Sequence, residues 1–124
     1  MKKQQKIDEK FLATNIEEEK LKNVFFRRVI HTSKYSQLVL MNIPPFEDIG
    51  IEIHYTTDQF IRIESGVGYA SLNGINYEIK DGISLSIDAG VYHNIVNTGN
   101  NPLKIYTIYS PPLHPSNEII LRKN

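Results

Sequence analysis

The sequence contains no cysteine, which excludes a disulfide framework and any metal site built on thiolates. It has no long apolar run either: the longest, Leu38 to Met41, has four residues, whereas a bilayer-spanning helix needs ~20. The lysine-rich start is not followed by an apolar segment, so no signal peptide is expected. Nor is there a net charge, because 14 Lys and Arg balance 14 Asp and Glu, whereas nucleic-acid-binding proteins usually carry a basic excess. We therefore expect a cytoplasmic protein that binds neither nucleic acid nor membrane.

The chain has 124 residues, a length typical of a single domain, and 40% of them are apolar. The charge is unevenly distributed. Residues 1–28 hold eight basic and five acidic side chains, a net of +3, whereas residues 29–121 hold four basic and nine acidic ones, a net of −5. Arg122 and Lys123 supply the remaining +2. An acidic body suits a divalent cation, and the cationic ends are expected to lie outside any pocket.

Three segments differ in pattern. Residues 1–23 are charge-dense and predict a flexible tail or a short helix that begins after Asn15, a plausible N-cap. Residues 24–115 alternate short apolar stretches with turn signals, among which Asn73-Gly74 predicts a type I′ hairpin. Residues 116–124 are expected to form a C-terminal tail. About nine short strands without a helical pattern indicate an all-β sandwich or barrel. The expected strands are 24–31, 37–42, 50–55, 59–64, 68–72, 76–80, 83–87, 93–97 and 103–109.

The stretch 50–55 allows two interpretations. With a period of two, Glu52 and His54 share one face of the strand, and the isoleucines and the tyrosine beside them share the other. Most strands turn the apolar face inward, which would leave Glu52 and His54 in water. A small barrel can instead enclose a polar ligand cavity. Gln59 favours the second alternative, because it shares its face with Ile61 and Ile63, where an amide needs a partner.

These residues resemble the two motifs of the cupin superfamily. In the first motif, Glu52-Ile53-His54 stands at the His-x-His position, Gln59 at the glutamate position, and Gly66 closes the motif. In the second, Gly82, Gly90, His93 and Asn97 have the expected spacing, with Asp88 in place of the proline. The resemblance covers residues 24–115 and is to small single-domain cupins of the mannose-6-phosphate isomerase-like kind. It implies a double-stranded β-helix, or jelly-roll, barrel.

The resemblance also implies a metal site. Glu52, His54, Gln59 and His93 take the four metal-ligand positions, with Glu52 replacing a histidine and Gln59 replacing a glutamate. Two imidazoles, one carboxylate and one amide oxygen suit a divalent ion such as Zn²⁺, Mn²⁺ or Fe²⁺. We further expect a substrate pocket for a small-molecule ligand, and a homodimer, as is common in cupins. The residues expected to line the pocket are Ile61, Tyr92, Tyr106, Tyr109 and His114.

Three functions remain open from the sequence. The first is a metal-dependent enzyme of sugar-isomerase-like chemistry acting on a small polar molecule, with His114 as a candidate proton shuttle. Two histidines and one carboxylate also suit a non-haem iron dioxygenase. The third is a module that binds a metal or small ligand without turnover, or a vestigial site. If the substrate is anionic, Arg62 or Lys104 is the expected cationic partner.

Overall fold

The computed structural model describes residues 6–7 and 10–123. Its elements are β1 (Lys6–Ile7), β2 (Leu12–Ala13), α1 (Ile16–Lys22), β3 (Arg27–Thr32), β4 (Gln37–Ile43), β5 (Asp58–Ser65), β6 (Val67–Leu72), β7 (Ile75–Lys80), β8 (Ser84–Ile87), β9 (His93–Asn97), β10 (Leu103–Ser110) and β11 (Ile119–Ile120). Within these residues α1 is the only helix, and no helix is long and apolar enough to cross a membrane.

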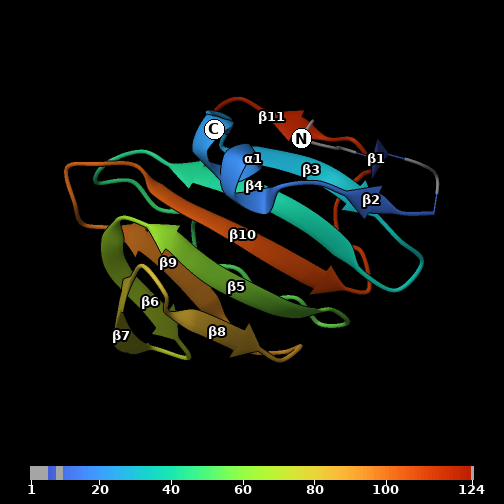
Figure 1. Cartoon of the computed structure of the whole chain (residues 1–124). Helices are drawn as coiled ribbons and strands as arrows, with labels where there is room; N and C mark the ends of the chain where they lie inside the picture. Colours follow the sequence, from blue (N-terminus) through green and yellow to red (C-terminus); the bar gives the residue numbers. More distant parts are fainter. Residues whose placement is uncertain (1–5, 8–9, 124) are drawn as a thin grey trace.

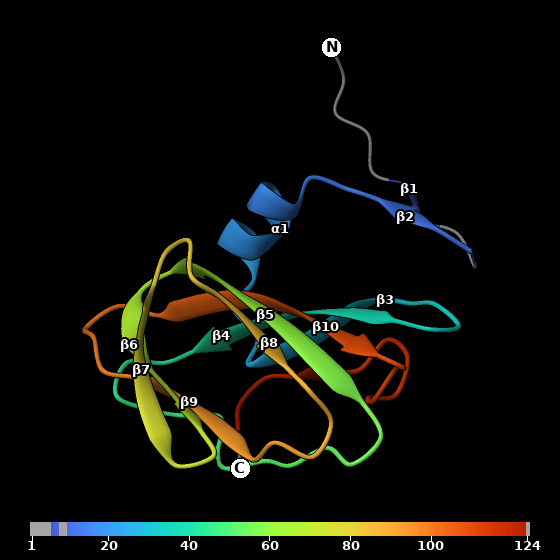
Figure 2. The ribbon, with the colours of Figure 1, turned by 90° about the horizontal axis from the view of Figure 1, so that it is seen from below.

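Two antiparallel sheets form the body of the molecule. The larger has six strands in the order β11-β3-β4-β10-β5-β8, and the smaller has three in the order β7-β6-β9. Figures 1 and 2 show the smaller sheet curled against one side of the larger, so that the strands enclose an interior. The short β1–β2 hairpin stands apart from both. The predicted all-β class is confirmed.

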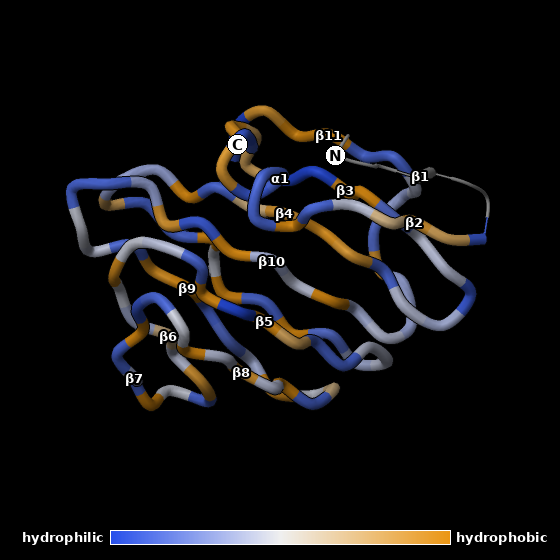
Figure 3. The backbone as a smooth tube through the Cα atoms, in the orientation of Figure 1, coloured by the Kyte–Doolittle hydropathy of each residue, from blue (hydrophilic) through white to orange (hydrophobic). Residues whose placement is uncertain are grey.

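The long strands β4, β5 and β10 carry many of the apolar residues (Figure 3), and burial alternates from residue to residue along β10. On β10, Leu103, Ile105, Thr107 and Tyr109 are buried, whereas the residues between them face outward. Antiparallel register aligns Ile105 with Met41 on β4 and with Ile63 on β5. Cross-strand partners point to the same side of a sheet, so these rows make the core. Gln59 lies on the interior face with the isoleucines, as the alternation predicted.

The turns follow the residues that the sequence places there. Asn73 and Gly74 join β6 to β7 with φ of 49° and 86°, the left-handed pair that a type I′ turn requires. Gly66, between β5 and β6, also has a positive φ of 97°. A Cβ there would meet the Leu103 Cα at 2.9 Å, so the glycine is needed for close approach as well as for conformation.

The N-terminal segment is more ordered than a tail from residue 10 onward. Asn15 caps α1, and its side chain accepts a hydrogen bond from the Glu18 backbone N–H at 3.1 Å. The helix lies on the outer face of the larger sheet (Figure 2), where Glu19 pairs with Arg28 at 3.3 Å and Lys20 pairs with Glu64 at 3.4 Å. Residues 1–5 and 8–9 of the expected tail lie outside the described residues.

Two other segments differ from expectation. Residues 50–55 do not form a strand; their chain is irregular and joins the small sheet through one isolated bridge between Glu52 and His93. The segment expected to be a C-terminal tail contributes β11, which pairs with β3 through Ile119 and Ile120. Both segments lie beside the interior, and both matter for the site.

Candidate metal centre

The centre begins with a backbone pairing. Glu52 and His93 exchange two hydrogen bonds, each N–H donating to the other's carbonyl at 2.8 Å. Residues paired in this way present their side chains on the same side, and His54, two residues further along, follows Glu52. A third hydrogen bond, from the Gly90 N–H to the His54 carbonyl at 2.8 Å, ties this irregular segment down. Three side chains from two distant segments are thereby aimed into the barrel.

Their donor atoms lie close together. One ligand atom from each of Glu52, His54 and His93 falls within 4.8 Å of the others. The two imidazole ring centroids are 5.2 Å apart. The neighbouring Ile51 and Tyr55 are 76% and 77% exposed, so the polar face of this segment is the one turned inward. Of the two interpretations that the sequence left open, the structure therefore selects the polar interior.

His93 is held in one tautomer. Its Nδ1 lies 2.9 Å from the Val91 carbonyl, which can only accept, so Nδ1 carries the hydrogen. The lone pair is then on Nε2, which is buried and has no hydrogen-bond partner. A ligand histidine whose other nitrogen donates to a carbonyl is the usual arrangement in metal sites.

His54 is in a similar state. Its Nε2 is also buried without a hydrogen-bond partner and lies 3.6 Å from a Glu52 carboxylate oxygen. Burial lowers the pKa of His54, and nearby His93 and Arg27 lower it further against the opposing effect of Glu52. The imidazole is therefore neutral near pH 7, the form that binds a metal ion.

Gln59 contributes an oriented amide. Its Nε2 donates to the Thr107 hydroxyl at 3.0 Å and to the Tyr109 hydroxyl at 3.3 Å. With both amide hydrogens used, the carbonyl oxygen Oε1 is left buried and without a partner. An unsatisfied buried acceptor is costly and uncommon, which favours a positively charged partner for this oxygen.

The donor set fits a divalent transition ion. Ligand atoms about 2.0–2.2 Å from a metal lie at most about 4.4 Å apart, so the 4.8 Å spread of the triad needs only a small contraction. Two imidazole nitrogens, a carboxylate oxygen and the Gln59 oxygen match Zn²⁺, Mn²⁺ or Fe²⁺ better than Ca²⁺ or Mg²⁺, which prefer oxygen alone.

Two further polar rings line the interior beside the triad. The ring of Tyr109 is 6.0 Å from that of His54 and 4.9 Å from that of His114. Gln37 fixes His114 by donating to its carbonyl at 2.7 Å and accepting from its N–H at 2.9 Å. Burial, together with nearby Arg27, lowers the pKa of His114 to about 4, and its Nε2 has no partner. Burial also raises the pKa of Tyr109 well above its usual value.

The other residues expected in the pocket are placed differently. Ile61 is fully buried on the interior face of β5 and forms part of the core. Tyr92 is 47% exposed, because its neighbour His93 takes the inward position. Tyr106 lies on the outer face of β10, where it contacts Phe60. The structure thus brings Tyr109 and His114 to the triad and leaves Tyr92 and Tyr106 away from it.

The expected cationic partners also lie outside. Arg62 is on the outer face of β5 and pairs with Glu64, and Lys104 donates to the Leu21 carbonyl on the same side. The cation that faces the interior is Arg27, whose register partner on β4 is the buried Met41. The expectation that the cationic ends lie outside the pocket is therefore wrong for Arg27. A sequence signal existed: Arg27 shares its strand face with buried Val29.

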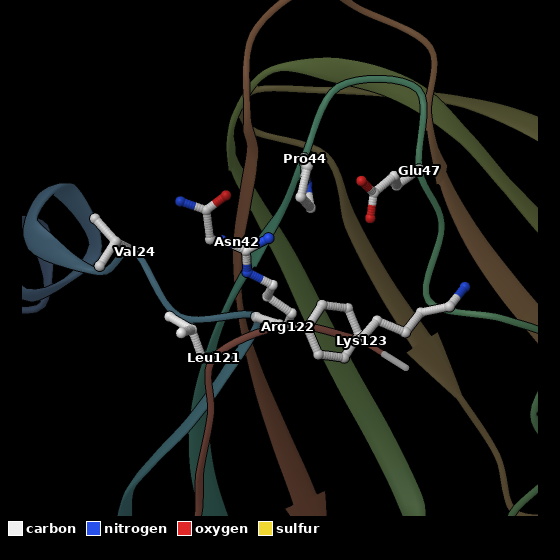
Figure 4. Close-up of a pocket in the computed structure, with 8 residues that line it drawn as sticks. Val24, Asn42, Pro44, Glu47, Leu121, Arg122 and Lys123 are labelled. Carbon is white, nitrogen blue, oxygen red and sulfur yellow. The ribbon is translucent and has the colours of Figure 1, made fainter.

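A separate cavity lies at the other end of the barrel. It has a volume of about 530 Å³ and lies beside Asn42, next to the last residue of β4 and far along that strand from Gln37. Figure 4 shows its lining. The lining residues are Val24, Phe26, Asn42, Pro44, Glu47, Leu121, Arg122 and Lys123. It includes no histidine and one carboxylate, so it is a poorer metal site than the triad.

Comparison with known proteins agrees with this geometry. Residues 39–109 match the family model described as the cupin domain. The chain belongs to the cupin family. The jelly-roll prediction is confirmed by the same match together with the two-sheet architecture. In this cupin, Gly82 and Gly90 of the second motif both adopt positive φ, and Asn97 is a structural residue that donates to the Ile43 carbonyl at 2.9 Å.

Similar proteins come from distant organisms. Uncharacterized protein L612 of Acanthamoeba polyphaga mimivirus is 50% identical over 90% of this chain and 72% of its own length. Uncharacterized protein YrkC of Bacillus subtilis is 41% identical over 83% of this chain, which spans 59% of the YrkC length. The crystal structure of BH2720 from Bacillus halodurans superposes with a TM-score of 0.86 at 42% identity, covering 88% of this chain and 87% of that one.

Proposed function

We propose that this cupin binds one divalent transition ion and uses it to act on a small polar molecule. Glu52, His54 and His93 would hold the ion, with the Gln59 carbonyl as the fourth ligand. The supporting observation is the convergence of two buried, unpartnered nitrogens, His54 Nε2 and His93 Nε2, with the Glu52 carboxylate, while the Gln59 Oε1 on the interior face is a third buried, unpartnered acceptor. A bound ion would satisfy all three at once.

The chemistry follows from the ligand count. A four-ligand site leaves room for a substrate oxygen, and the ion, when bound, acts as a Lewis acid that polarises a carbonyl or hydroxyl. His114 can take up or deliver a proton at Nε2, because it is neutral at pH 7 and that atom has no partner. Tyr109 lies between His114 and His54 and keeps its hydroxyl proton. Isomerase-like proton transfer is the reaction type that these residues support best.

A second candidate rests on the same triad. Two histidines and one carboxylate with an open position are the ligand set of non-haem Fe²⁺ oxygenases. If the purified protein retains iron in preference to zinc or manganese, this function gains over the isomerase-like one. A module that binds without turnover is the outcome if the metal binds but its remaining positions accept no small ligand.

The test is metal analysis of the full chain and of His93→Ala. We expect about one bound ion per chain in the wild type and a loss of at least about tenfold in metal affinity in the variant, because one of three strong ligands is gone. His31→Ala is the matched control, since His31 lines a groove beside Tyr106 on the outer face of the sheet. Equal metal binding by wild type and His93→Ala would sink the proposal.

The assembly and location of the protein stay predictions. A homodimer is supported by the two large apolar side chains Ile51 and Tyr55, which lie exposed next to the ligand residues Glu52 and His54. Light scattering of the purified protein would give its mass in solution. A monomer at micromolar concentration would contradict the dimer, and fractionation of cells that express the chain would test the cytoplasmic location.

A further inference from the structure

The interior contains a second polar cluster that the metal site does not use. Arg27 Nη1 donates to Glu118 Oε1 at 3.1 Å, and His114 Nδ1 lies 3.7 Å from the same oxygen. His114 in turn packs edge-on against Tyr109, and Tyr109 against His54. A continuous row of side chains therefore leads from Arg27 to the triad.

Arg27 has donor capacity that nothing in the described residues takes up. Its Nε is buried and has no acceptor, although Nη1 is paired with Glu118. His114 Nε2, further along the row, is also buried and unpartnered. Native structures satisfy nearly all buried N–H groups, and a guanidinium matches a planar carboxylate with two parallel hydrogen bonds. The side chains of Arg27 and Glu118 remain 17% and 19% exposed, so solvent reaches this end of the row.

The positive charge of Arg27 acts on the interior. It lowers the pKa of His54, Tyr109 and His114, all of which face the barrel. The neighbouring Arg28 provides the contrast: it pairs with Glu19 of α1 on the outer face, at 3.3 Å. Two adjacent arginines thus make similar ion pairs on opposite sides of one sheet, and only Arg27 can meet a ligand in the barrel.

We propose that Arg27 binds a carboxylate of the molecule that occupies the barrel, so that the substrate is a small carboxylic acid. This inference rests on the proposed function in one respect only, namely that the other end of the bound molecule would lie at the metal ion. It deepens that function by naming the substrate class.

The charges favour a carboxylate over a phosphate. Arg27 and Glu118 cancel, and Glu52 offsets one of the two charges of a divalent ion, while the histidines bind as neutral ligands. The interior then carries one net positive charge at the ion and none at the Arg27–Glu118 pair. A carboxylate brings a single negative charge to Arg27, and the second carboxylate of a dicarboxylic acid would lie at the ion. A phosphate, with close to two negative charges at pH 7, would place both of them beside the Glu118 carboxylate.

The test measures binding of malonate, succinate and glutarate to the full chain by calorimetry, with and without Mn²⁺. Succinamide is the neutral control and inorganic phosphate the competing anion. We expect at least one dicarboxylate to bind and succinamide not to bind. Arg27→Met should weaken the dicarboxylate about 10- to 100-fold, since a charge-assisted hydrogen bond is lost. Arg28→Met, the outer-face control, should leave the affinity unchanged.

Glu118→Gln supplies a result of opposite sign. It removes the competing carboxylate while keeping Arg27, so dicarboxylate affinity should rise several-fold; a purely structural ion pair would lower it in both variants. This also decides the matter if Arg27→Met does not fold. Unchanged binding in Arg27→Met, a fall in Glu118→Gln, or phosphate binding more tightly than every dicarboxylate would each overturn the proposal.

The same samples separate this inference from the metal proposal. Arg27→Met should keep the wild-type metal content, because Arg27 touches none of the four ligands. If the wild type binds no metal but its dicarboxylate affinity still depends on Arg27, the carboxylate subsite stands and the metal-dependent function falls. If the wild type binds metal fully but its dicarboxylate affinity does not depend on Arg27, the metal-dependent function stands and the carboxylate subsite falls.

Discussion

Gln59→Glu replaces the amide nitrogen of the side chain by an oxygen. We expect it to have opposite effects on the stability of the metal-free and the metal-bound protein. A glutamate could still accept hydrogen bonds from the Thr107 and Tyr109 hydroxyls, which lie 3.0 and 3.3 Å from the amide nitrogen today. It would also place a second carboxylate in the interior that Glu52 faces, in a position that is 3% exposed. Burial and like charge raise the pKa of such a carboxyl, so the ionised glutamate should lower the stability of the metal-free protein by about 1.4–3 kcal/mol.

In the metal-bound protein the same substitution should be stabilising. A carboxylate is a stronger ligand than an amide oxygen, and the added charge attracts the cation. We expect the dissociation constant for Mn²⁺ or Zn²⁺ to fall by about 10- to 100-fold, each factor of ten adding about 1.4 kcal/mol to the stability of the loaded protein. Gln59→Glu should therefore be less stable than wild type in EDTA and gain more stability when the ion is added.

The assay is urea unfolding in EDTA and in buffered free metal, with Gln59→Met as the matched variant. Methionine has similar length but no oxygen, so its metal affinity should fall. If all three proteins have the same metal dissociation constant, the Gln59 oxygen is not a ligand and the four-ligand centre is refuted. If wild type and Gln59→Glu have equal stability in EDTA, water solvates the side chain at position 59 more than its burial indicates.

Two more outcomes are expected. Gln37→Leu removes the side chain that binds the backbone of Leu113 and His114, so unfolding in urea should show a loss of about 3 kcal/mol; a loss under about 1 kcal/mol would contradict this role. The pKa of His114 is near 6.5 when unfolded and about 4 when folded. Between those values the unfolded chain binds more protons, so stability falls on acidification by up to about 1.4 kcal/mol per pH unit. The slope should be shallower in His114→Gln, and equal slopes in EDTA would count against a buried neutral imidazole.

Local signals predicted most of the fold. Alternation placed Gln59 and the β5 isoleucines on one face, and both the Asn73-Gly74 turn and the Asn15 cap appear in the structure as expected. These features depend on residues within a few positions of one another, and so they can be read without knowing the rest of the chain.

The site was predictable only in part. The spacing of Glu52, His54, Gln59 and His93 singled them out, and the structure brings their segments to one interior. The same spacing did not show that Ile51 and Tyr55 face outward, because an alternating pattern has two equally regular faces. The Glu52–His93 backbone bridge decides between them, and it joins residues 41 positions apart.

Arg27 shows the same limit from the other direction. Arg27 is one of the basic residues that give the N-terminal segment its positive charge, and the sequence therefore predicted that it lies outside the pocket. Inside the barrel it is stabilised by Glu118, 91 positions away, whose neighbouring strand β11 lies beside β3. A guanidinium that is mostly buried needs a negatively charged partner, and here the partner comes from a distant part of the chain that only the tertiary structure brings close.

The sequence by itself determined the strand periods, the turns, the helix cap and the set of chemically competent side chains, since each is encoded by neighbouring residues. Only the tertiary structure decided which strand face is inside, that residues 50–55 reach the interior through one bridge, and that the C-terminal segment brings His114 and Glu118 to Arg27. Those outcomes depend on long-range pairing, in which the free energy of burial and of buried hydrogen bonds selects one arrangement among several that local pattern allows equally.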